Sequence, residues 1–549
     1  MKGHALMKKQ MMNIIFFISL NVMSTLFAFR YGPLLMSIHL IVSFFSAYWM
    51  IFKKHFLEKS VLKIQNNLMN YICCIASVSI GIIHIKSFYK NLFVMFQKLE
   101  TFLKLSANLQ ELLAIIISIL FFVSSFFAIF IIMLAFFDKI SDFIKKEQIR
   151  ICEDEKIYLR IVCICLGIFV IILFNCTNIF YFPKQNNELI KYDVIYTMNT
   201  GELFNENAWL NISASQNDIR QPLFAVFAIP FAVICFIISK ILFFIPNCYA
   251  VLLTLLQALL ISYSYVLISR LMKLEGKERR LFLALCTFTY PFLLFALNME
   301  QYVFSTFWMI MFIYSALTDR ENINYLYIAA TGSMLTSGIF FYFLSESKKL
   351  KQWIRDVIKV SIDFFVVTIY AGQFIFFVLL IPSMKSLLRF SGAEISISDK
   401  ILQFFNFVAT CLIAPETMIA NNMYNCVSLQ LAPVRTINIL GIVVLIIVIL
   451  GYIYNKKDKL AQVCMIWVIF SFVILCLLGW GTKENGLVLY TLYFSWAYIV
   501  LSVMFLKKIL KKEKMRSFVY IALIGILILK NLSAMVELVK FGIEYYPIV

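Results

Sequence analysis

"LLAIIISILFFVSSFFAIFIIMLAFF", residues Leu112–Phe137, is an unbroken apolar run whose length decides the fold class. A helix needs about 20 apolar residues to cross the hydrocarbon core of a bilayer, and this run is longer. Similar runs recur along the 549 residues, of which 62% are hydrophobic and 14% charged. The sequence therefore predicts an all-α polytopic membrane protein, because a membrane barrel would show short alternating strands instead.

The net charge of +19 follows the membrane-topology pattern. Lys and Arg cluster in short loops at the ends of apolar runs, as in 53–63 and 138–156. Such loops stay in the cytoplasm under the positive-inside rule, so we expect no nucleic-acid partner. The first apolar run, Met12–Phe29, has no small-residue cleavage site after it and is expected to be an anchor. The N-terminus is then cytoplasmic, in a multi-pass protein of the plasma membrane.

Two long segments are expected outside the cell. Five crossings from a cytoplasmic N-terminus place residues 183–221 outside, and residues 382–435 form a second long outer loop. The basic cluster of residues 270–280 must lie inside. The whole chain then makes about 12–13 full crossings. The five initial crossings are Met12–Phe29, Leu34–Phe52, Asn70–Ile85, Leu112–Phe137 and Tyr158–Tyr181.

Two apolar segments are expected to be partial or re-entrant. Pro222–Phe244 contains Pro230 and Lys240, and a full crossing here would place the basic cluster of residues 270–280 outside. We therefore expect an interrupted segment that lies at the outer face or re-enters. Ile323–Leu344 meets the same difficulty and holds "ATGSMLTSG" at its centre, which predicts a broken helical hairpin. Non-helical backbone at membrane depth needs protein or water around it.

No soluble domain is expected. We divide the chain into an N-terminal four-helix membrane region, 1–157, and a membrane region that carries the long outer loops, 158–549. The thirteen cysteines lie mostly inside apolar runs, and all four histidines precede residue 90. No protein metal site is predicted, and a divalent metal is left open as a cofactor. Cys411 and Cys426 could pair outside the cell, but nothing in the spacing requires it.

The candidate functional residues are polar groups at the expected outer ends of the spans. Charges are costly at membrane depth, so such groups mark a site more often than scattered surface charges do. An acidic outer loop can also simply be solvated. The residues in question are Asp193, Glu202, Glu206, Asp218, Arg220, Gln221, Glu300, Gln301, Glu416, Lys483 and Glu484.

Four of these segments carry a family resemblance. Asp193 follows a span, "DIRQPLFAVFAIP" (Asp218–Pro230) leads into an apolar run, and an outer turn bears Glu300. A late charged turn opens "GWGTKENGLVLYTLYFSWAYIV" (Gly479–Val500). Over Tyr158–Leu506 this order resembles the glycosyltransferase C superfamily, which includes protein and lipid mannosyltransferases and aminoarabinose transferases. Gln221 stands where that family has a basic residue, and one proline stands where it has two.

The resemblance implies a function and a set of roles. Members take a sugar from a polyprenyl-phosphate donor and pass it, here with inversion, to a glycan, lipid or protein acceptor of the cell envelope at the outer face. Asp193 and Asp218 would be catalytic. The substrate-binding residues would be Arg220, Gln221, Glu300, Lys483 and Glu484.

Elementary chemistry points the same way. Transfer from a sugar phosphate needs a base for the acceptor hydroxyl, which a carboxylate can supply. It also needs a positively charged group beside the leaving phosphate, and Arg220 or Lys483 could provide it.

Two other functions share the outer loops. One is a flippase or transporter for a lipid-linked oligosaccharide, which would place charges along a central path and often shows two related halves. The other is a polysaccharide polymerase or ligase, which usually relies on Arg and His in its outer loops. The spans hold almost no acids, the halves do not match and the outer loops lack His. We therefore expect the transferase.

Overall fold

The structure is a computed structural model. It describes residues 2–28, 33–53, 106–144, 151–185, 187–212, 220–318, 323–346, 349–371, 391–422, 424–483 and 486–548, with pieces of 70–85 and residues 214, 320 and 373. Asp218, Glu484 and residues 374–390 of the second long loop lie outside the described residues.

Helices make up about 74% of the structure, strands are short and few among the described residues, and the expected all-α polytopic membrane fold is confirmed. Within the described ranges, eight helices are long and apolar enough to cross a membrane. The pair α10 (Gly276–Thr287) and α11 (Tyr290–Leu297), bent by 63° beside Pro291, adds a ninth if the two helices form one span. Other apolar helices, such as α12 (Gln301–Leu317), are shorter. The count of 12–13 full crossings therefore stays a prediction.

Two ends of the molecule can be defined from α6 (Glu153–Leu173) and α9 (Cys248–Leu271), which pack side by side in opposite directions. At one end Arg270 and Arg279 bind the buried carboxylate of Glu155, with N–O distances of 2.5 and 3.0 Å. We call this end the basic face. At the other end Asn247 Nδ2 donates to the Tyr181 hydroxyl at 2.7 Å. We call that end the loop face.

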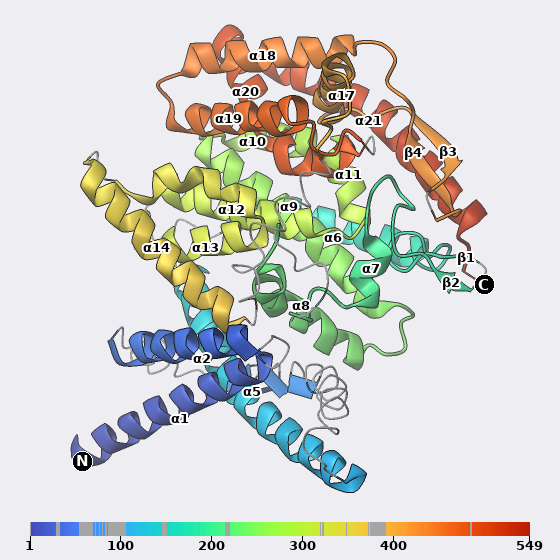
Figure 1. The fold of residues 1–549 in the computed structure, drawn as a ribbon. Coiled ribbons are helices and arrows are strands. Elements are labelled where there is room, and N and C mark those ends of the chain that lie inside the picture. The colour runs from blue at the N-terminus through green and yellow to red at the C-terminus, as the bar shows by residue number, and fades with distance from the viewer. Residues whose placement is uncertain are drawn as a thin grey trace.

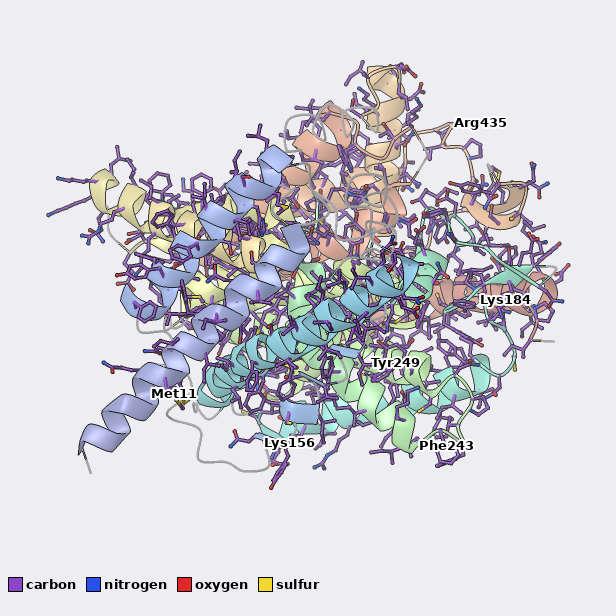
Figure 2. The ribbon with its side chains drawn as sticks, turned by 60° about the horizontal axis from the view of Figure 1, so that its bottom comes forward. Met11, Lys156, Lys184, Phe243, Tyr249 and Arg435 are labelled. Atoms are coloured by element: carbon purple, nitrogen blue, oxygen red, sulfur yellow. The ribbon has the colours of Figure 1, made fainter. Side chains whose placement is uncertain are left out.

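The long loops gather at the loop face (Figure 1). The first loop forms β1 (Lys184–Gln185), β2 (Glu188–Leu189) and α7 (Thr200–Asn205). The second forms an antiparallel hairpin of β3 (Thr417–Asn421) and β4 (Val427–Leu431). Figure 2 shows Lys184 and Arg435, one from each loop, toward the same side of the molecule and Met11 toward the opposite side. The described parts of the two segments that carry β1–β2 and β3–β4 therefore share one face.

The C-terminal end of α21 (Glu513–Tyr545) joins the loop face. Thr177 Oγ1 donates to the carbonyl oxygens of Gly542 and Tyr546 at 2.8 and 2.7 Å. The two loops are also joined directly, because Leu429 N donates to Val194 O at 2.9 Å. The loop face is therefore one packed layer rather than a set of independent loops.

The first segment expected to be partial is α8 (Phe224–Ile241), a continuous helix. The expectation that Pro230 interrupts it is wrong. By length and composition α8 could cross a membrane, so its partial crossing stays a prediction. Phe224 and Phe231 both contact Phe304 of α12, and Phe231 also contacts Phe307 and Trp308.

The connection after α8 lies at the loop face. It carries Asn247, which binds Tyr181, and is followed by Tyr249, whose hydroxyl donates to Asn207 Oδ1 at 3.0 Å. Asn207 belongs to the first long loop, and Tyr181 directly precedes it. α9 then runs from the loop face to Arg270 at the basic face.

The second such segment is a broken hairpin, as expected. α13 (Ile323–Ser333) and the 3-10 helix η2 (Leu335–Leu344) meet at Met334, which has extended backbone. Near the basic-face end of α12, Arg320 donates to Phe343 O at 2.7 Å. At the apex, Ser305 Oγ donates to Ser333 O at 2.9 Å. The chain thus rises from the basic half, turns beside α12 and returns.

The N-terminal helices pack mainly on one another. α1 (Lys2–Ala28), α2 (Pro33–Tyr48) and α5 (Ala107–Ile144) enclose a separate small core that includes Phe16 and Phe121. One other helix, α14 (Leu350–Tyr370), adds Val366 to this core. The remaining helices form one large core, to which the end of α5 contributes Met133 and Leu134. The other regular helices are α17 (Ile397–Thr410), α18 (Ile439–Asn455), α19 (Lys459–Ser471) and α20 (Thr491–Ile509); irregular turns are η1 (Trp49–Lys53), η4 (Phe472–Leu477) and η5 (Leu487–Tyr490).

Candidate active site at the loop face

The turn of residues 193–199 has an unusual backbone. Asp193 and Tyr196 both adopt left-handed conformations, with φ of 57° and 54°. Asp adopts this conformation fairly often, but for a bulky residue such as Tyr it is energetically unfavourable. The turn is closed by Asp193 N, which donates to Met198 O at 3.1 Å. Such strained positions persist only where surrounding structure fixes them, and they are frequent at functional sites.

Four separate segments fix this turn. Asn422 Nδ2 donates to Asp193 O at 3.3 Å, and Tyr196 N donates to Leu429 O at 2.7 Å; both partners come from the β3–β4 hairpin. The Tyr196 and Tyr290 hydroxyls share a hydrogen bond at the bend before α11. The third segment is that of Gly486, whose lack of a side chain leaves room for Thr197. The fourth is that of Glu300, which accepts a hydrogen bond from Asn199 N.

Glu300 occupies the turn that precedes α12 and is 4% exposed. Asn199 N donates to Glu300 Oε1 at 2.9 Å, and Glu300 N donates to Gln257 Oε1 at 3.3 Å. Gln257 is the tenth residue of α9, which places it about 14 Å from the first residue at 1.5 Å per residue. The carboxyl therefore lies below the loop layer, and the first long loop reaches down to it.

The surroundings of Glu300 change its acidity. Burial raises the pKa of this carboxyl to about 7 from an ordinary 4.5, because a low-dielectric environment penalises the charged form. The backbone amides of Asn199 and Gln301 and the charge of Arg220 act in the opposite direction but do not cancel the effect. A carboxyl in this range can exchange a proton near neutral pH.

The Arg220-Gln221-Pro222 motif holds the chain against the apex of the broken hairpin. Leu335 N donates to Arg220 O and Leu223 N donates to Gly332 O, each at 2.8 Å. A Cβ on Gly332 would lie 2.7 Å from the Leu223 Cβ, so only glycine fits there. Gln221 is buried, and Arg220 lies close enough to Glu300 for its charge to act on the carboxyl.

Three tyrosines stand beside this cluster. The Tyr302 ring contacts those of Tyr490 and Tyr493, with centroids 5.6 and 6.2 Å apart. The Tyr493 hydroxyl is 2.7 Å from Ser337 Oγ of the hairpin. These three tyrosines were not predicted from the sequence as site residues. The i, i+3 spacing of Tyr490 and Tyr493, directly after a charged turn, was the available signal.

The predicted site residues do not all meet. Asp193, Arg220, Gln221 and Glu300 lie on segments that are bonded together. Lys483 instead forms an exposed ion pair with Glu394 at 3.4 Å, where the two side chains are 55% and 84% exposed. Asp218 and Glu484 are outside the described residues. Glu202, a candidate residue of the first outer loop, is buried on α7.

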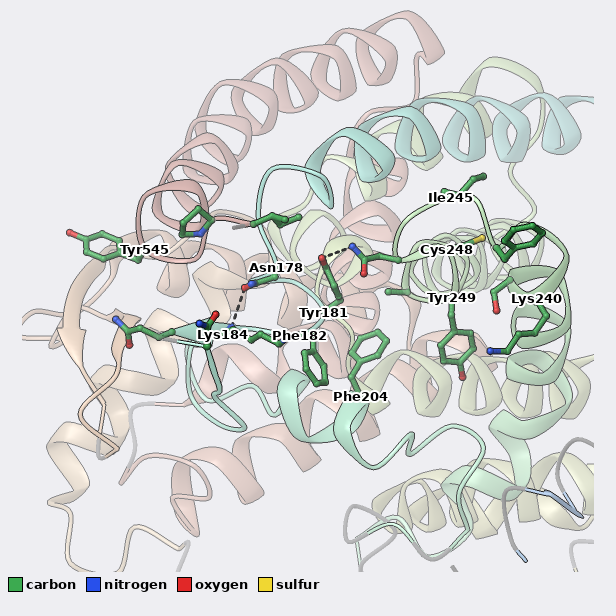
Figure 3. Close-up of a pocket in the computed structure, with 18 of the residues that line it drawn as sticks. Asn178, Tyr181, Phe182, Lys184, Phe204, Lys240, Ile245, Cys248, Tyr249 and Tyr545 are labelled. Atoms are coloured by element: carbon green, nitrogen blue, oxygen red, sulfur yellow. Dashed lines mark hydrogen bonds between the residues drawn. The ribbon is translucent and has the colours of Figure 1, made fainter. Parts of the chain in front are cut away.

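No metal cluster is found in the described part of the chain: no three His, Cys, Asp or Glu side chains there could hold an ion together. A cavity of about 1140 Å³ lies at the loop face, but its lining does not include Asp193, Arg220 or Glu300 (Figure 3). Compared with models of known families, with curated proteins and with solved structures, the chain matches none. Its function must therefore be argued from the chemistry of its own residues.

Proposed function

We propose that the protein is a membrane glycosyltransferase that moves a sugar from a polyprenyl-phosphate donor to an acceptor hydroxyl at the loop face. The observation that carries the proposal is the strained turn of Asp193, fixed by four other segments beside a buried carboxyl and an arginine. Strained backbone and buried ionisable groups both concentrate at functional sites.

The reaction assigns a role to each group. The acceptor oxygen forms a bond to the anomeric carbon while the bond from that carbon to the phosphate oxygen breaks. The electron pair leaves with the phosphate, and the acceptor proton passes to Asp193. Asp193 is half-buried, so an acceptor can reach it. The Arg220 guanidinium stabilises the negative charge of the phosphate.

Glu300 is a positioning residue in this scheme. Its carboxyl is 4% exposed and accepts the amide of Asn199 at the end of the Asp193 turn. It therefore acts on the reaction through the turn, and through the charge of Arg220, rather than by contact with the acceptor. Gln221 supports the same arrangement because it is buried beside the hairpin apex.

The membrane supplies the rest of the donor site. Ile234, Ile238 and Ile241 on α8 are exposed, and on an apolar helix that ends at the loop face they face lipid. A polyprenyl chain can stay in the bilayer there while its phosphate approaches Arg220. The distribution of Lys and Arg supports a loop face outside the plasma membrane and a cytoplasmic N-terminus.

One observation favours a second function. The broken hairpin carries Gly, Ser and Thr at its apex beside a buried carboxyl, and discontinuous helices of this kind build the binding sites of transporters. A transporter of a lipid-linked sugar would use the same groups for binding but would leave the sugar–phosphate bond intact.

Donor consumption separates the two functions. Purified protein in nanodiscs receives a labelled polyprenyl-phosphate sugar and a cell-envelope extract as acceptor, and the released polyprenyl phosphate is measured. If the protein is a transferase, polyprenyl phosphate should be released. Arg220→Ala should then raise the KM for the donor, because a lost ground-state contact weakens binding. An intact donor that crosses the bilayer of proteoliposomes with the wild-type protein would instead support the transporter.

A further inference from the structure

Asn531 is an amide side chain in α21 that faces the protein interior. α21 packs against α10 and α11 (Figure 1), but only 22% of its most apolar part is buried. The Asn531 side chain, in contrast, is fully buried. A polar group inside an apolar helix needs hydrogen-bond partners, because no water is there to replace them. Asn531 finds its partners in the backbone of two other segments.

The first of these segments is the bend between α10 and α11. Asn531 Nδ2 donates to Phe288 O at 2.7 Å. Phe288 directly follows the last residue of α10, and the axes of α10 and α11 differ by 63°. A helix end leaves its last carbonyl oxygens without helical donors, so the Asn531 amide stabilises this bend.

The second segment follows the end of α17. Asn531 Nδ2 also donates to Leu412 O at 2.8 Å, and Ala414 N donates to Asn531 Oδ1 at 2.8 Å. Leu412 O accepts a further bond, from Tyr290 N at 3.1 Å. Asn531 and Tyr290 therefore meet at one carbonyl oxygen, which joins the end of α17 to the first residue of α11.

Tyr290 connects this arrangement to the Asp193 turn. Its hydroxyl shares a hydrogen bond with the Tyr196 hydroxyl, and both side chains are buried. Tyr196 has the left-handed φ of 54°, which is unfavourable for a bulky residue. Tyr196 and Asp193 belong to one closed turn, because Asp193 N donates to Met198 O. A shift of Tyr290 would therefore also shift the backbone that carries the Asp193 carboxyl.

We infer that Asn531 and Tyr290 are positioning residues for the Asp193 turn. Asn531 fixes the bend before α11, and the Tyr290 hydroxyl holds Tyr196 in its left-handed conformation. The consequence for catalysis rests on the proposed function, in which Asp193 is the base. Arg220 takes no part in these bonds, so donor binding should not depend on the two residues.

Hydrogen–deuterium exchange tests the structural link without an assay of activity. The full-length protein is measured in nanodiscs by mass spectrometry, with one peptide that contains residues 193–199 and one that contains residues 412–414. Tyr290→Phe removes only the hydroxyl, so exchange should become roughly threefold to tenfold faster in the first peptide, the size expected for one lost hydrogen bond. The second peptide should not change. Asn531→Asp keeps the size of the side chain and its acceptor oxygen but loses the amide donors, and it should speed exchange in both peptides.

Tyr327→Phe is the matched control, because it removes a tyrosine hydroxyl that donates to Gly338 O at 2.8 Å inside the broken hairpin. Exchange at residues 193–199 should equal that of wild type. Unchanged exchange of this peptide in Tyr290→Phe or in Asn531→Asp would overturn the inference. So would equally faster exchange throughout the protein, since the two residues would then support the fold in general.

Steady-state kinetics test the consequence for catalysis. Tyr290→Phe should lower kcat for polyprenyl phosphate release roughly tenfold to a hundredfold, because a small displacement of a reacting group has a cost of this size. The KM for the donor should stay within about twofold of wild type, because ground-state contacts are kept. A raised KM with normal kcat would contradict a positioning role. If the wild type released no polyprenyl phosphate, the transferase would be excluded, while the exchange result would still decide whether the two residues fix the turn.

Discussion

The backbone amide of Asn199 donates a hydrogen bond of 2.9 Å to the carboxyl of Glu300, which lies 101 residues later in the chain. This bond joins the first long loop to the turn before α12. It carries the end of the strained Asp193 turn down beside the apex of the broken hairpin. The geometry of the candidate site therefore depends on a contact between a loop backbone and one buried acid.

The first prediction concerns the pH dependence that Glu300 confers. Its folded pKa of about 7 is above the ordinary 4.5, so folding favours the protonated form. This contribution to stability is fully present below the ordinary pKa and is lost as pH rises through about 7. Melting temperatures in detergent, measured from about pH 5 to pH 8, should fall more steeply for wild type than for Glu300→Gln.

Glu300→Gln keeps an oxygen that can accept the Asn199 amide, whereas Glu300→Ala removes it. The alanine variant should therefore be less stable at every pH, by roughly 1–3 kcal/mol for a buried donor left unsatisfied. Parallel pH profiles for wild type and the glutamine variant would show that Glu300 does not titrate in this range.

A second prediction addresses the hairpin apex. Gly332→Ala should destabilise the protein by about 1–3 kcal/mol, because the new methyl group would overlap Leu223 in a packed region. Gly525 in α21 is the control, since a Cβ there meets nothing within 4 Å. Gly525→Ala should be neutral or stabilising by roughly 0.5–1 kcal/mol. Thermal melting of the two variants in the same detergent gives the comparison, and equal stabilities would contradict the assigned packing.

The third prediction concerns the basic face. Glu155→Gln should cost about 3–5 kcal/mol, because it leaves Arg270 and Arg279, whose side chains are only 11% and 15% exposed, without their common partner. Glu153→Gln is the matched control two residues away, where the ion pair with Lys156 is exposed. It should cost less than about 1 kcal/mol. Urea or thermal unfolding in micelles measures both, and a small effect at Glu155 would exclude a stabilising role for the cluster.

The fourth prediction is the orientation in the membrane. Cys176 and Cys152 are both exposed and lie near opposite ends of α6. If the loop face is outside, a membrane-impermeant maleimide applied to intact cells should label a variant that retains only Cys176. A variant that retains only Cys152 should be labelled only after the cells are opened. The reverse pattern would invert the proposed topology.

The membrane architecture was largely predictable because it depends on local composition. Apolar runs mark helices, and the charges around Ile323–Leu344 required both of its ends to lie near the basic face, as the Arg320 contact shows. The same argument predicted a partial crossing for α8, which by length and composition could also be a full one. The role given to Pro230 was wrong, since α8 continues through this residue. A missing amide donor at one position does not end a helix that is packed on its neighbours.

The assembly of the site was only partly predictable. Asp193, Arg220 and Glu300 were identified as polar groups at expected span ends, but no local pattern links Asn199 to Glu300 or Leu223 to Gly332. The burial of Glu300 and Glu202 could not be predicted from the sequence either, because acids in loops are mostly solvated. Lys483 was identified on the same grounds, and the structure pairs it with the exposed Glu394 instead. Sequence position therefore located the candidate segments, and tertiary packing selected among their residues.

The rate of sugar transfer by Asp193→Asn tests the central claim most directly. The assay measures release of polyprenyl phosphate at saturating donor by wild type, Asp193→Asn and the control Glu188→Gln, which changes an exposed acid in the same loop. If Asp193 is the base, its amide variant should lose roughly 10²–10⁴-fold in kcat, with normal melting and with Glu188→Gln near wild type. Near-normal turnover by Asp193→Asn would contradict the account.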